Sequence, residues 1–214
     1  MRSVRVCFKK NGPAKYISHL DLNRFMIKII RMSRIPVWYS EGFNPHPYIT
    51  FAQPLSLGFE GNYEFMDLRV NDDDFTNDDV YNALVGLMPE GLTILSCNDP
   101  VMKSGEIAYA EYEIFFDTNN IECMDKLVNF LSQDSIVTKK KTKKGSFKDI
   151  DLKEFVKYYS VDGSILRLTL SAGASNNLNP KLILDAFESK CQHTLPFNSV
   201  TRVMLYNEEM KKFR

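Results

Sequence analysis

The stretch SHLDLNRFMIKII, residues 18–30, gives the clearest helix signal in this chain of 214 residues. Ser18 and Asp21 match a helix N-cap, in which a serine oxygen accepts an amide hydrogen bond and an acid lies in the first turn. Beyond them, apolar residues recur at the three- and four-residue spacing of one helix face. The basic residues of the opposite face are Arg24, Lys28 and Arg31. The sequence therefore predicts a helix with a basic outer face.

The segments around this helix are predicted to be strands and one further helix. Residues 2–9 alternate in polarity and end at the turn Asn11-Gly12-Pro13, which is typical of a strand. Pro36 ends the first helix, because proline lacks the amide hydrogen that a helix interior needs. The same criteria predict strands over residues 37–39, 48–51, 63–70 and 92–97, and a helix over residues 77–87. The order is strand, helix, strand, strand, helix, strand.

The second half repeats this order. Alternation and helical spacing predict a strand, a helix and the start of a strand over residues 109–116, 122–131 and 135–138. A hairpin is predicted where Asp162-Gly163 separates residues 155–161 from 165–171. A helix over 180–189 and a strand over 199–206 complete the pattern. We therefore expect an α+β protein of two tandem ferredoxin-like (βαββαβ) units with antiparallel sheets, residues 1–99 and 107–214, joined by a linker at 99–106.

Composition places the chain among soluble globular proteins. Hydrophobic residues make up 44% and charged residues 25% of the chain. No apolar stretch approaches the ~20 residues of a bilayer span, and the N-terminus lacks the pattern of a secretory signal. The four cysteines are far apart and form no metal-ligand spacing. We expect a cytoplasmic protein with no membrane partner, no metal site and no cofactor.

The charge is distributed in blocks, although the net charge is zero. Residues 1–35 hold nine basic residues and one acid, residues 60–134 hold seventeen acids and three basic residues, and residues 139–157 hold eight lysines and three acids. Such asymmetry can steer a polyanion to one face of a molecule. The alternative is that the blocks pair with one another or lie on solvated faces.

Residues 39–47, YSEGFNPHP, form the most distinctive segment. Two prolines flank His46, so this segment is predicted to be a stiff loop. Aromatic rings and an imidazole beside cations are the groups with which proteins bind single-stranded RNA, since rings stack on bases and cations contact phosphates. The alternative is that Phe43 and Tyr48 belong to the core and that the prolines only turn the chain.

The common catalytic motifs of nucleotide-binding and hydrolytic enzymes are missing from the sequence. His19, near Lys15, Tyr16 and Ser18, could act as a general acid or base on a phosphodiester. The alternative is that His19 packs or forms hydrogen bonds locally in the first turn of its helix. His19 and His46 are therefore weak catalytic candidates, and whether the protein is an enzyme stays open, with a non-enzyme favoured.

A lysine cluster, KKKTKK at residues 139–144, is predicted to be a loop between strands or a phosphate-contacting arm. Together with the segments above it completes the set of candidate RNA-binding residues. These are Lys15, Tyr16, His19, Arg24, Lys28, Arg31, Tyr39, Phe43, Asn44, His46, Lys140, Lys141 and Lys143.

Four short motifs together resemble one bacterial family. They are KYISHLDL at 15–22, IPV at 35–37, YSEGFNPHP at 39–47 and FAQPLSLG at 51–58. They are similar to the radical SAM-linked protein family, a domain of unknown function found beside, or fused after, a cobalamin-binding-type radical SAM protein. Glu64 and Asp67 fit the strand that follows, and the resemblance covers about the first third of the chain. It implies a non-catalytic companion of a radical SAM enzyme and brings no catalytic residues, although His19 and His46 match its motifs.

Three functional hypotheses follow. The first is an accessory protein that binds RNA, or presents an RNA substrate, through the basic helix and the loop at 39–47. The second is a metal-independent endoribonuclease, because the predicted fold resembles that of the repeat-associated RNA-processing proteins of bacterial immunity. The third is a protein–protein adaptor that docks a radical SAM partner through its acidic residues 72–79 and binds no nucleic acid.

Overall fold

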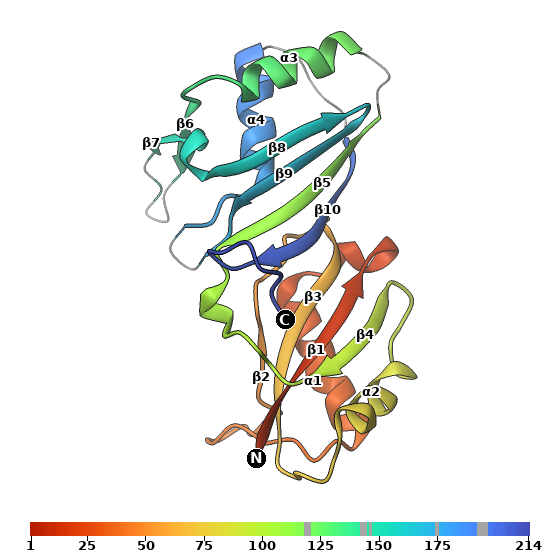
Figure 1. Cartoon of the computed structure of the whole chain (residues 1–214). Coiled ribbons are helices and arrows are strands. Elements are labelled where there is room, and N and C mark those ends of the chain that lie inside the picture. The colour runs from red at the N-terminus through yellow and green to blue at the C-terminus, as the bar shows by residue number, and fades with distance from the viewer. Residues whose placement is uncertain (118–120, 142–144, 146, 174–175, 192–196) are drawn as a thin grey trace. The chain divides into compact units, whose positions relative to one another are not determined.

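The computed structural model describes residues 1–117, 121–141, 145, 147–173, 176–191 and 197–214. Its contacts divide the chain into two compact units (Figure 1). The first unit comprises Met1–Glu106 with Lys212–Arg214, and the second comprises Ile107–Lys211. The sequence-based division differs at two places, because it placed a linker at residues 99–106 and assigned residues 212–214 to the second unit.

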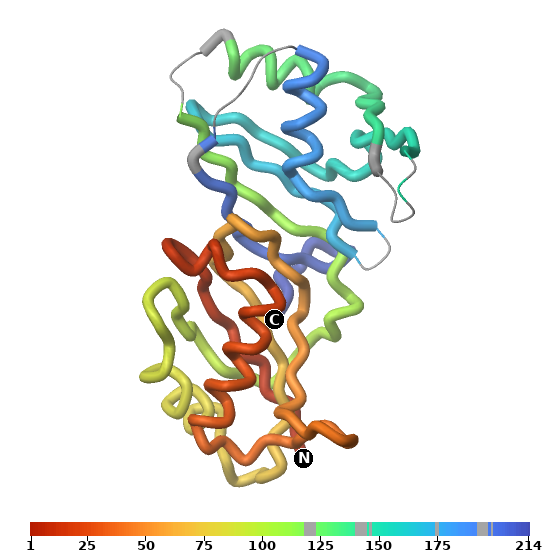
Figure 2. The backbone as a smooth tube through the Cα atoms, turned by 180° about the vertical axis from the view of Figure 1, so that it is seen from behind, coloured from red at the N-terminus to blue at the C-terminus, as the bar shows by residue number. Residues whose placement is uncertain are grey.

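The first unit contains the predicted order of strands and helices. Its elements are β1 (Arg2–Lys10), α1 (His19–Ser33), β2 (Ile49–Phe51), β3 (Glu60–Val70), α2 (Asn77–Val85) and β4 (Leu92–Asn98), with 3-10 helices at Gly12–Tyr16 and Ser104–Glu106. The strands pair in the order β4-β1-β3-β2, and each of these pairs is antiparallel. Within this unit, α1 and α2 lie over one face of the sheet (Figure 2).

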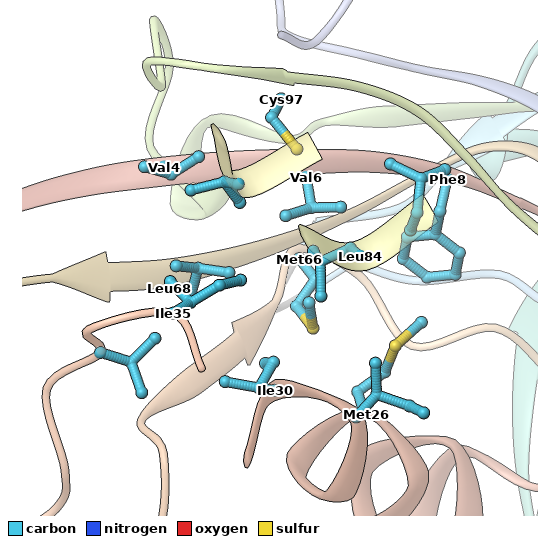
Figure 3. Close-up of a cluster of buried hydrophobic side chains, with 14 of the residues drawn as sticks. Val4, Val6, Phe8, Met26, Ile30, Ile35, Met66, Leu68, Leu84 and Cys97 are labelled. Carbon is cyan, nitrogen blue, oxygen red and sulfur yellow. The ribbon is translucent and has the colours of Figure 1, made fainter. Parts of the chain in front are cut away.

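The core of the first unit lies between that face and the two helices (Figure 3). Alternate residues of β1 and β3 point into it, as the period of two in a strand requires. From the helices, side chains at helical spacing complete the layer. The core residues include Val4, Val6, Phe8, Met66, Leu68, Leu22, Met26, Ile30, Val80 and Leu84, all at most 4% exposed.

The described part of the second unit contains six strands, two α-helices and one 3-10 helix. Its elements are β5 (Tyr109–Phe116), α3 (Ile121–Leu131), β6 (Val137–Lys141), β7 (Phe147–Asp151), β8 (Val156–Asp162), β9 (Ile165–Ser171), α4 (Pro180–Cys191) and β10 (Phe197–Tyr206), with a 3-10 helix at Leu152–Phe155. Four strands pair antiparallel in the order β10-β5-β9-β8. The helices α3 and α4 meet through Phe130 and Phe187, whose rings pack edge to face at 5.5 Å. The chain is therefore an α+β protein.

Three local predictions need correction. The predicted strand at 37–39 forms only isolated bridges, Val37 to Val70 and Tyr39 to Pro47. The residues after 135 form the hairpin β6–β7 rather than one strand that runs into a loop. The sequence Phe-Lys-Asp-Ile-Asp of β7 is largely polar and exposed, so hydrophobic alternation did not reveal it. In the β8–β9 hairpin, Asp162 pairs with Ile165, so the turn residues lie one position later than predicted.

The last residues of the chain pack into the first unit. Phe213 is 1% exposed, and its ring packs edge to face on Phe65 at 5.2 Å. The guanidinium of Arg5 lies 4.3 Å above the Phe213 ring and donates to the carbonyl of Arg214 at 2.9 Å. The amides of Val101 and Met102 donate to the same carbonyl at 3.2 and 3.1 Å. Residues 212–214 are thus part of the first unit's fold.

None of the helices in the described parts of the chain combines the length and the apolar character that crossing a bilayer requires.

Candidate nucleic-acid interface

Helix α1 begins where the sequence predicts it. Ser18 is the N-cap, and its Oγ accepts a hydrogen bond from the amide of Asp21 at 3.2 Å. The Asp21 carboxylate accepts in turn from the Ser18 hydroxyl at 2.7 Å, and it lies in the first turn, where the helix dipole favours an acid. The helix ends at Arg34, which adopts a left-handed conformation with φ of 60°. These local interactions fix where α1 begins and where it ends.

The exposed face of α1 carries the cations that the sequence placed there. Arg24 forms an ion pair with Asp21 at 3.4 Å. For Lys28, Arg31 and Arg34, no carboxylate of the described residues lies within ion-pair distance, and all three are exposed. Their charge is therefore available to an anion from solution.

Residues 38–48 form a closed loop beside this helix. The chain leaves the edge of β3 at Trp38, whose amide donates to the carbonyl of Arg69, and returns at Ile49, which pairs with Leu68. Across the loop, the amide of Ser40 donates to the carbonyl of His46 at 2.9 Å, and the amide of Tyr48 donates to that of Trp38 at 3.0 Å. Backbone hydrogen bonds thus hold the loop at its base.

The ring of His46 braces the tip of this loop. Its Nδ1 lies 3.0 Å from Ser40 Oγ and 3.1 Å from the carbonyl oxygen of Asn44. The Ser40 hydroxyl oxygen also accepts from the His46 amide at 3.3 Å. The described residues give Nε2 no hydrogen-bond partner, and His46 is exposed. The outer nitrogen of the ring can therefore bind a ligand without loosening the loop.

One hydrogen bond joins the helix to the loop. The Arg31 guanidinium donates from Nη2 to the carbonyl oxygen of Pro45 at 3.2 Å. The exposed face of α1 and the loop therefore lie side by side, as the first functional hypothesis requires. We call Arg24, Lys28, Arg31, Arg34 and residues 39–46 the helix–loop surface.

Phe43 is the most exposed large apolar side chain of this surface, at 104% of its reference area. The alternative that Phe43 is a core residue is therefore wrong. Tyr39 and Tyr48 are 43% and 36% exposed, so the loop carries aromatic rings on its outside. An apolar side chain held in water at the tip of a braced loop is typical of a contact residue.

Sequence reasoning missed the residues that support the loop at its base. The Arg69 guanidinium lies 5.4 Å from the ring of Trp38 and 5.1 Å from that of Tyr48. The two rings pack edge to face at 5.2 Å. Arg69 comes from β3, and only strand pairing brings it beside the loop. The sequence feature that could have indicated this support is Trp38, the single tryptophan of the chain, which directly precedes residues 39–47.

His19 lies in a different place, in a small pocket of the first unit. The pocket has a volume of about 10 Å³, which is close to the space one water molecule needs. Its polar lining residues are Lys10, His19, Gln53 and Glu64. Lys10 and Glu64 are only 1% and 4% exposed, and the Lys10 ammonium donates to the carbonyl of Lys15 at 3.1 Å. Sequence reasoning did not identify this polar group, since its members are far apart in the chain.

His19 and His46 do not share a cleft. His19 begins α1, and its ring packs edge to face on Phe51 at 5.1 Å. His46 lies in the loop that Arg31 contacts. Arg31 is twelve residues after His19 on α1, which is about 18 Å at the helical rise per residue. The pocket around His19 includes no residue of the loop. A site that uses both histidines is therefore not assembled.

The remaining candidates are divided among other places. Lys15 forms an ion pair with Glu60 at 3.8 Å, and its ammonium lies 5.4 Å from the ring of Tyr16, near the His19 end of α1. Lys140 and Lys141 belong to β6, and Lys143 lies outside the described residues. Within the described parts of the chain, no three His, Cys, Asp or Glu side chains are grouped to hold a metal ion.

Comparison with known proteins gives two further results. No curated protein matches the sequence. Among solved structures, a chain in the structure entitled "Crystal Structure of a Cbf5-Nop10-Gar1 Complex" is similar at a TM-score of 0.49 and 12% sequence identity. The similarity covers 96% of this chain and 50% of that one, so this protein spans about half of the other chain's length. A TM-score below 0.5 at this identity establishes neither a common fold nor a common activity.

A family model matches most of the sequence. The match extends over residues 3–180, which includes the helix–loop surface, the His19 pocket and most of the second unit. The family is described as an uncharacterized protein conserved in bacteria, DUF2344. Because the match covers well over half of the chain, this protein belongs to the DUF2344 family.

Proposed function

We propose that this protein is a non-catalytic accessory protein of a radical SAM enzyme, and that it binds RNA, or presents an RNA substrate, on its helix–loop surface. The observation that carries the RNA part is the hydrogen bond from Arg31 to Pro45, which holds the basic face of α1 against the loop with the exposed Phe43. Cations for phosphates and a ring for bases thereby lie on one surface.

The charge of this surface supports an anionic ligand. Asp21 is engaged by Arg24, so Glu41 is the one remaining acid among residues 19–46. Lys28, Arg31 and Arg34 outnumber it. Each exposed cation that contacts a phosphate releases condensed counterions, which is the main source of affinity in such complexes.

The radical SAM partner is supported by the resemblance of residues 15–22, 35–37, 39–47 and 51–58 to the radical SAM-linked family. Motif 39–47 forms the loop of the proposed surface, and motif 15–22 contains Ser18, the N-cap of α1, together with the first turn of that helix. A protein that holds RNA but has no reaction of its own would present that RNA to the enzyme encoded beside it or fused to it.

We also infer that the two units are tandem ferredoxin-like units. The inference is supported by the strand orders β4-β1-β3-β2 and β10-β5-β9-β8, in which the fourth strand lies beside the first and the third lies between the first and second. This is the arrangement expected for a βαββαβ unit with both helices on one face.

The geometry does not favour the endoribonuclease alternative. Arg31, which contacts the loop of His46, lies about 18 Å along α1 from His19, and the pocket of His19 includes no residue of that loop, so the two histidines are not placed as an acid and a base for one phosphodiester. His19 alone stays a candidate. Cleavage of labelled RNA in EDTA that disappears in His19→Ala would support it, whereas an unchanged rate would remove that residue.

Filter binding of a structured RNA pool at two salt concentrations tests the proposal. We expect binding that weakens as salt rises, and a further loss of at least tenfold in the double reversal Lys28→Glu with Arg31→Glu. The double reversal Lys103→Glu with Lys212→Glu, at two exposed lysines outside the helix–loop surface, changes the net charge by the same amount and should bind as the unaltered protein does.

The outcomes separate the hypotheses. Indifference of RNA binding to the double reversal would overturn the proposed surface. No RNA binding at all, together with co-purification of a radical SAM protein that resists nuclease and is lost when Asp73 and Asp74 are neutralised, would replace the proposal with the adaptor hypothesis.

A further inference from the structure

We propose that the helix–loop surface selects unpaired nucleotides, with one base stacked on the Phe43 ring while the cations of α1 hold the phosphates beside it. This inference rests on the proposed function and specifies its ligand: single-stranded RNA, or the single-stranded loop of a folded RNA, in preference to duplex.

Phe43 is fully exposed to solvent. At 104% of its reference area, the ring makes almost no contact within the molecule. Burying a phenylalanine side chain normally stabilises a fold, and Phe43 contributes no such stabilisation. The ring has its full apolar surface available for a ligand.

The loop that carries the ring is held by contacts on both sides of Phe43. Gly42, which precedes Phe43, adopts φ of 129°, a conformation that side-chain-bearing residues rarely reach. On the other side of Phe43, Nδ1 of the His46 ring lies within hydrogen-bond distance of Ser40 Oγ and of the Asn44 carbonyl oxygen. Arg31 then ties Pro45 to α1. Because the loop is already ordered, little conformational entropy remains to be lost on binding.

Unpaired RNA offers this ring a binding partner that duplex RNA does not. In a duplex, both faces of each internal base are covered by neighbouring base pairs, so a protruding ring cannot stack on them. In a single strand, every base can offer a face, and stacking on an aromatic side chain is largely independent of sequence. Phe43 can therefore distinguish unpaired from paired RNA without reading the sequence.

The cations of the helix–loop surface can contact three phosphates. Lys28, Arg31 and Arg34 are the exposed cations of the surface that no described carboxylate pairs with. Three phosphate contacts on a single strand give an expected slope of about −2 for the logarithm of the binding constant against the logarithm of salt concentration. Loss of one contact should reduce the magnitude of the slope by about 0.7.

Fluorescence anisotropy with a labelled 12-nucleotide single strand and the same strand in a blunt duplex tests the inference. We expect the single strand to bind more tightly than the duplex. Phe43→Ala should weaken single-strand binding about tenfold, leave duplex binding and the salt slope unchanged, and be rescued by Phe43→Trp. Leu57→Ala removes another exposed apolar side chain, 63% exposed, and is the control for a general effect of apolar surface.

The possible results distinguish this inference from the function on which it rests. Equal binding of both RNA forms, with Phe43→Ala unchanged, overturns the selection of unpaired nucleotides but leaves RNA binding standing. Failure to bind either form, or a salt slope near zero, overturns the proposed function itself. Loss of a protein partner in Phe43→Ala, with no RNA bound, assigns the exposed ring to a protein interface and overturns both.

Discussion

Burial, together with a smaller effect of the nearby Glu64 carboxylate, raises the pKa of Cys7 from 9.0 to about 12. The pKa of Cys97 is likewise raised to about 12, first by burial and then by the proximity of Cys7 and Asp78. Both cysteines are free thiols in the first unit. At neutral pH they are protonated, and since the thiolate is the reactive form, they are inert packing residues rather than nucleophiles.

These raised pKa values predict an alkaline loss of stability. In the unfolded chain each thiol releases its proton near pH 9, whereas in the folded protein it holds the proton up to about pH 12. The unfolded state therefore binds fewer protons in this range, and the free energy of unfolding falls as pH rises from 9 toward 12. Urea unfolding at pH 8, 9, 10 and 11 measures the decline, which should be smaller in Cys7→Ala. Identical declines in the two proteins would show that Cys7 does not contribute.

At the scale of elements, α1 is the structure on which the proposed surface depends. It presents Leu22, Met26, Ile29 and Ile30 to the core and its cations to solvent. Both faces are set by the spacing of the apolar residues, because successive side chains are rotated by about 100° around a helix. The start is set by Ser18, whose side chain covers one of the free amides of the first turn.

The N-cap can be tested directly. Ser18→Ala removes the hydrogen bond from the Asp21 amide and should lower the free energy of unfolding by about 1 kcal/mol. Thr76→Ala on α2 is a useful comparison, because Thr76 and Asp79 form a complete capping box and the loss should be at least as large. Ser18→Thr keeps an acceptor and should be close to neutral. Urea unfolding measures all three variants. An unchanged free energy of unfolding in Ser18→Ala would contradict the capping role.

At the scale of the whole molecule, the chain returns to its first unit at its end. Phe213 fills a buried site beside Phe65, and Arg5 joins this site to the sheet through a bidentate ion pair with Asp67, with both distances 2.7 Å. Arg5 is 3% exposed, so its guanidinium is satisfied by Asp67, the Arg214 carbonyl and the Phe213 ring together. Residues 212–214 thus complete a polar and aromatic cluster of the first unit.

Phe213→Ala should therefore destabilise the first unit. Loss of a buried phenylalanine costs about 3 kcal/mol or more when the surroundings do not collapse. Phe213→Leu retains much of the apolar contact and should cost clearly less. Urea unfolding monitored by fluorescence of Trp38, the single tryptophan of the chain and a residue of the first unit, reports the effect. A Phe213→Ala protein with unchanged unfolding would show that the tail does not support this unit.

The local elements of the chain follow from short-range chemistry. The cap at Ser18, the apolar spacing from Leu22 to Ile30 and the turn after Asp162 act within a few residues of one another, so each could be predicted from its own segment. Where the segment had little hydrophobic signal, as in β7, prediction failed. The stiff loop at 39–47 was also predictable, because proline restricts its own backbone and that of the residue before it.

Long-range pairing decided everything that depends on partners distant in the chain. Three contacts need a particular strand register or chain path. They are the stack of Arg69 on Trp38 and Tyr48, the group of Lys10, Gln53 and Glu64 around His19, and the packing of Phe213 on Phe65. No pattern within one segment encodes a register, since pairing is fixed by the packing of all strands and helices together. The contact of Arg31 with Pro45 belongs to this group: both residues were singled out by type, but only the fold brought them within 3.2 Å.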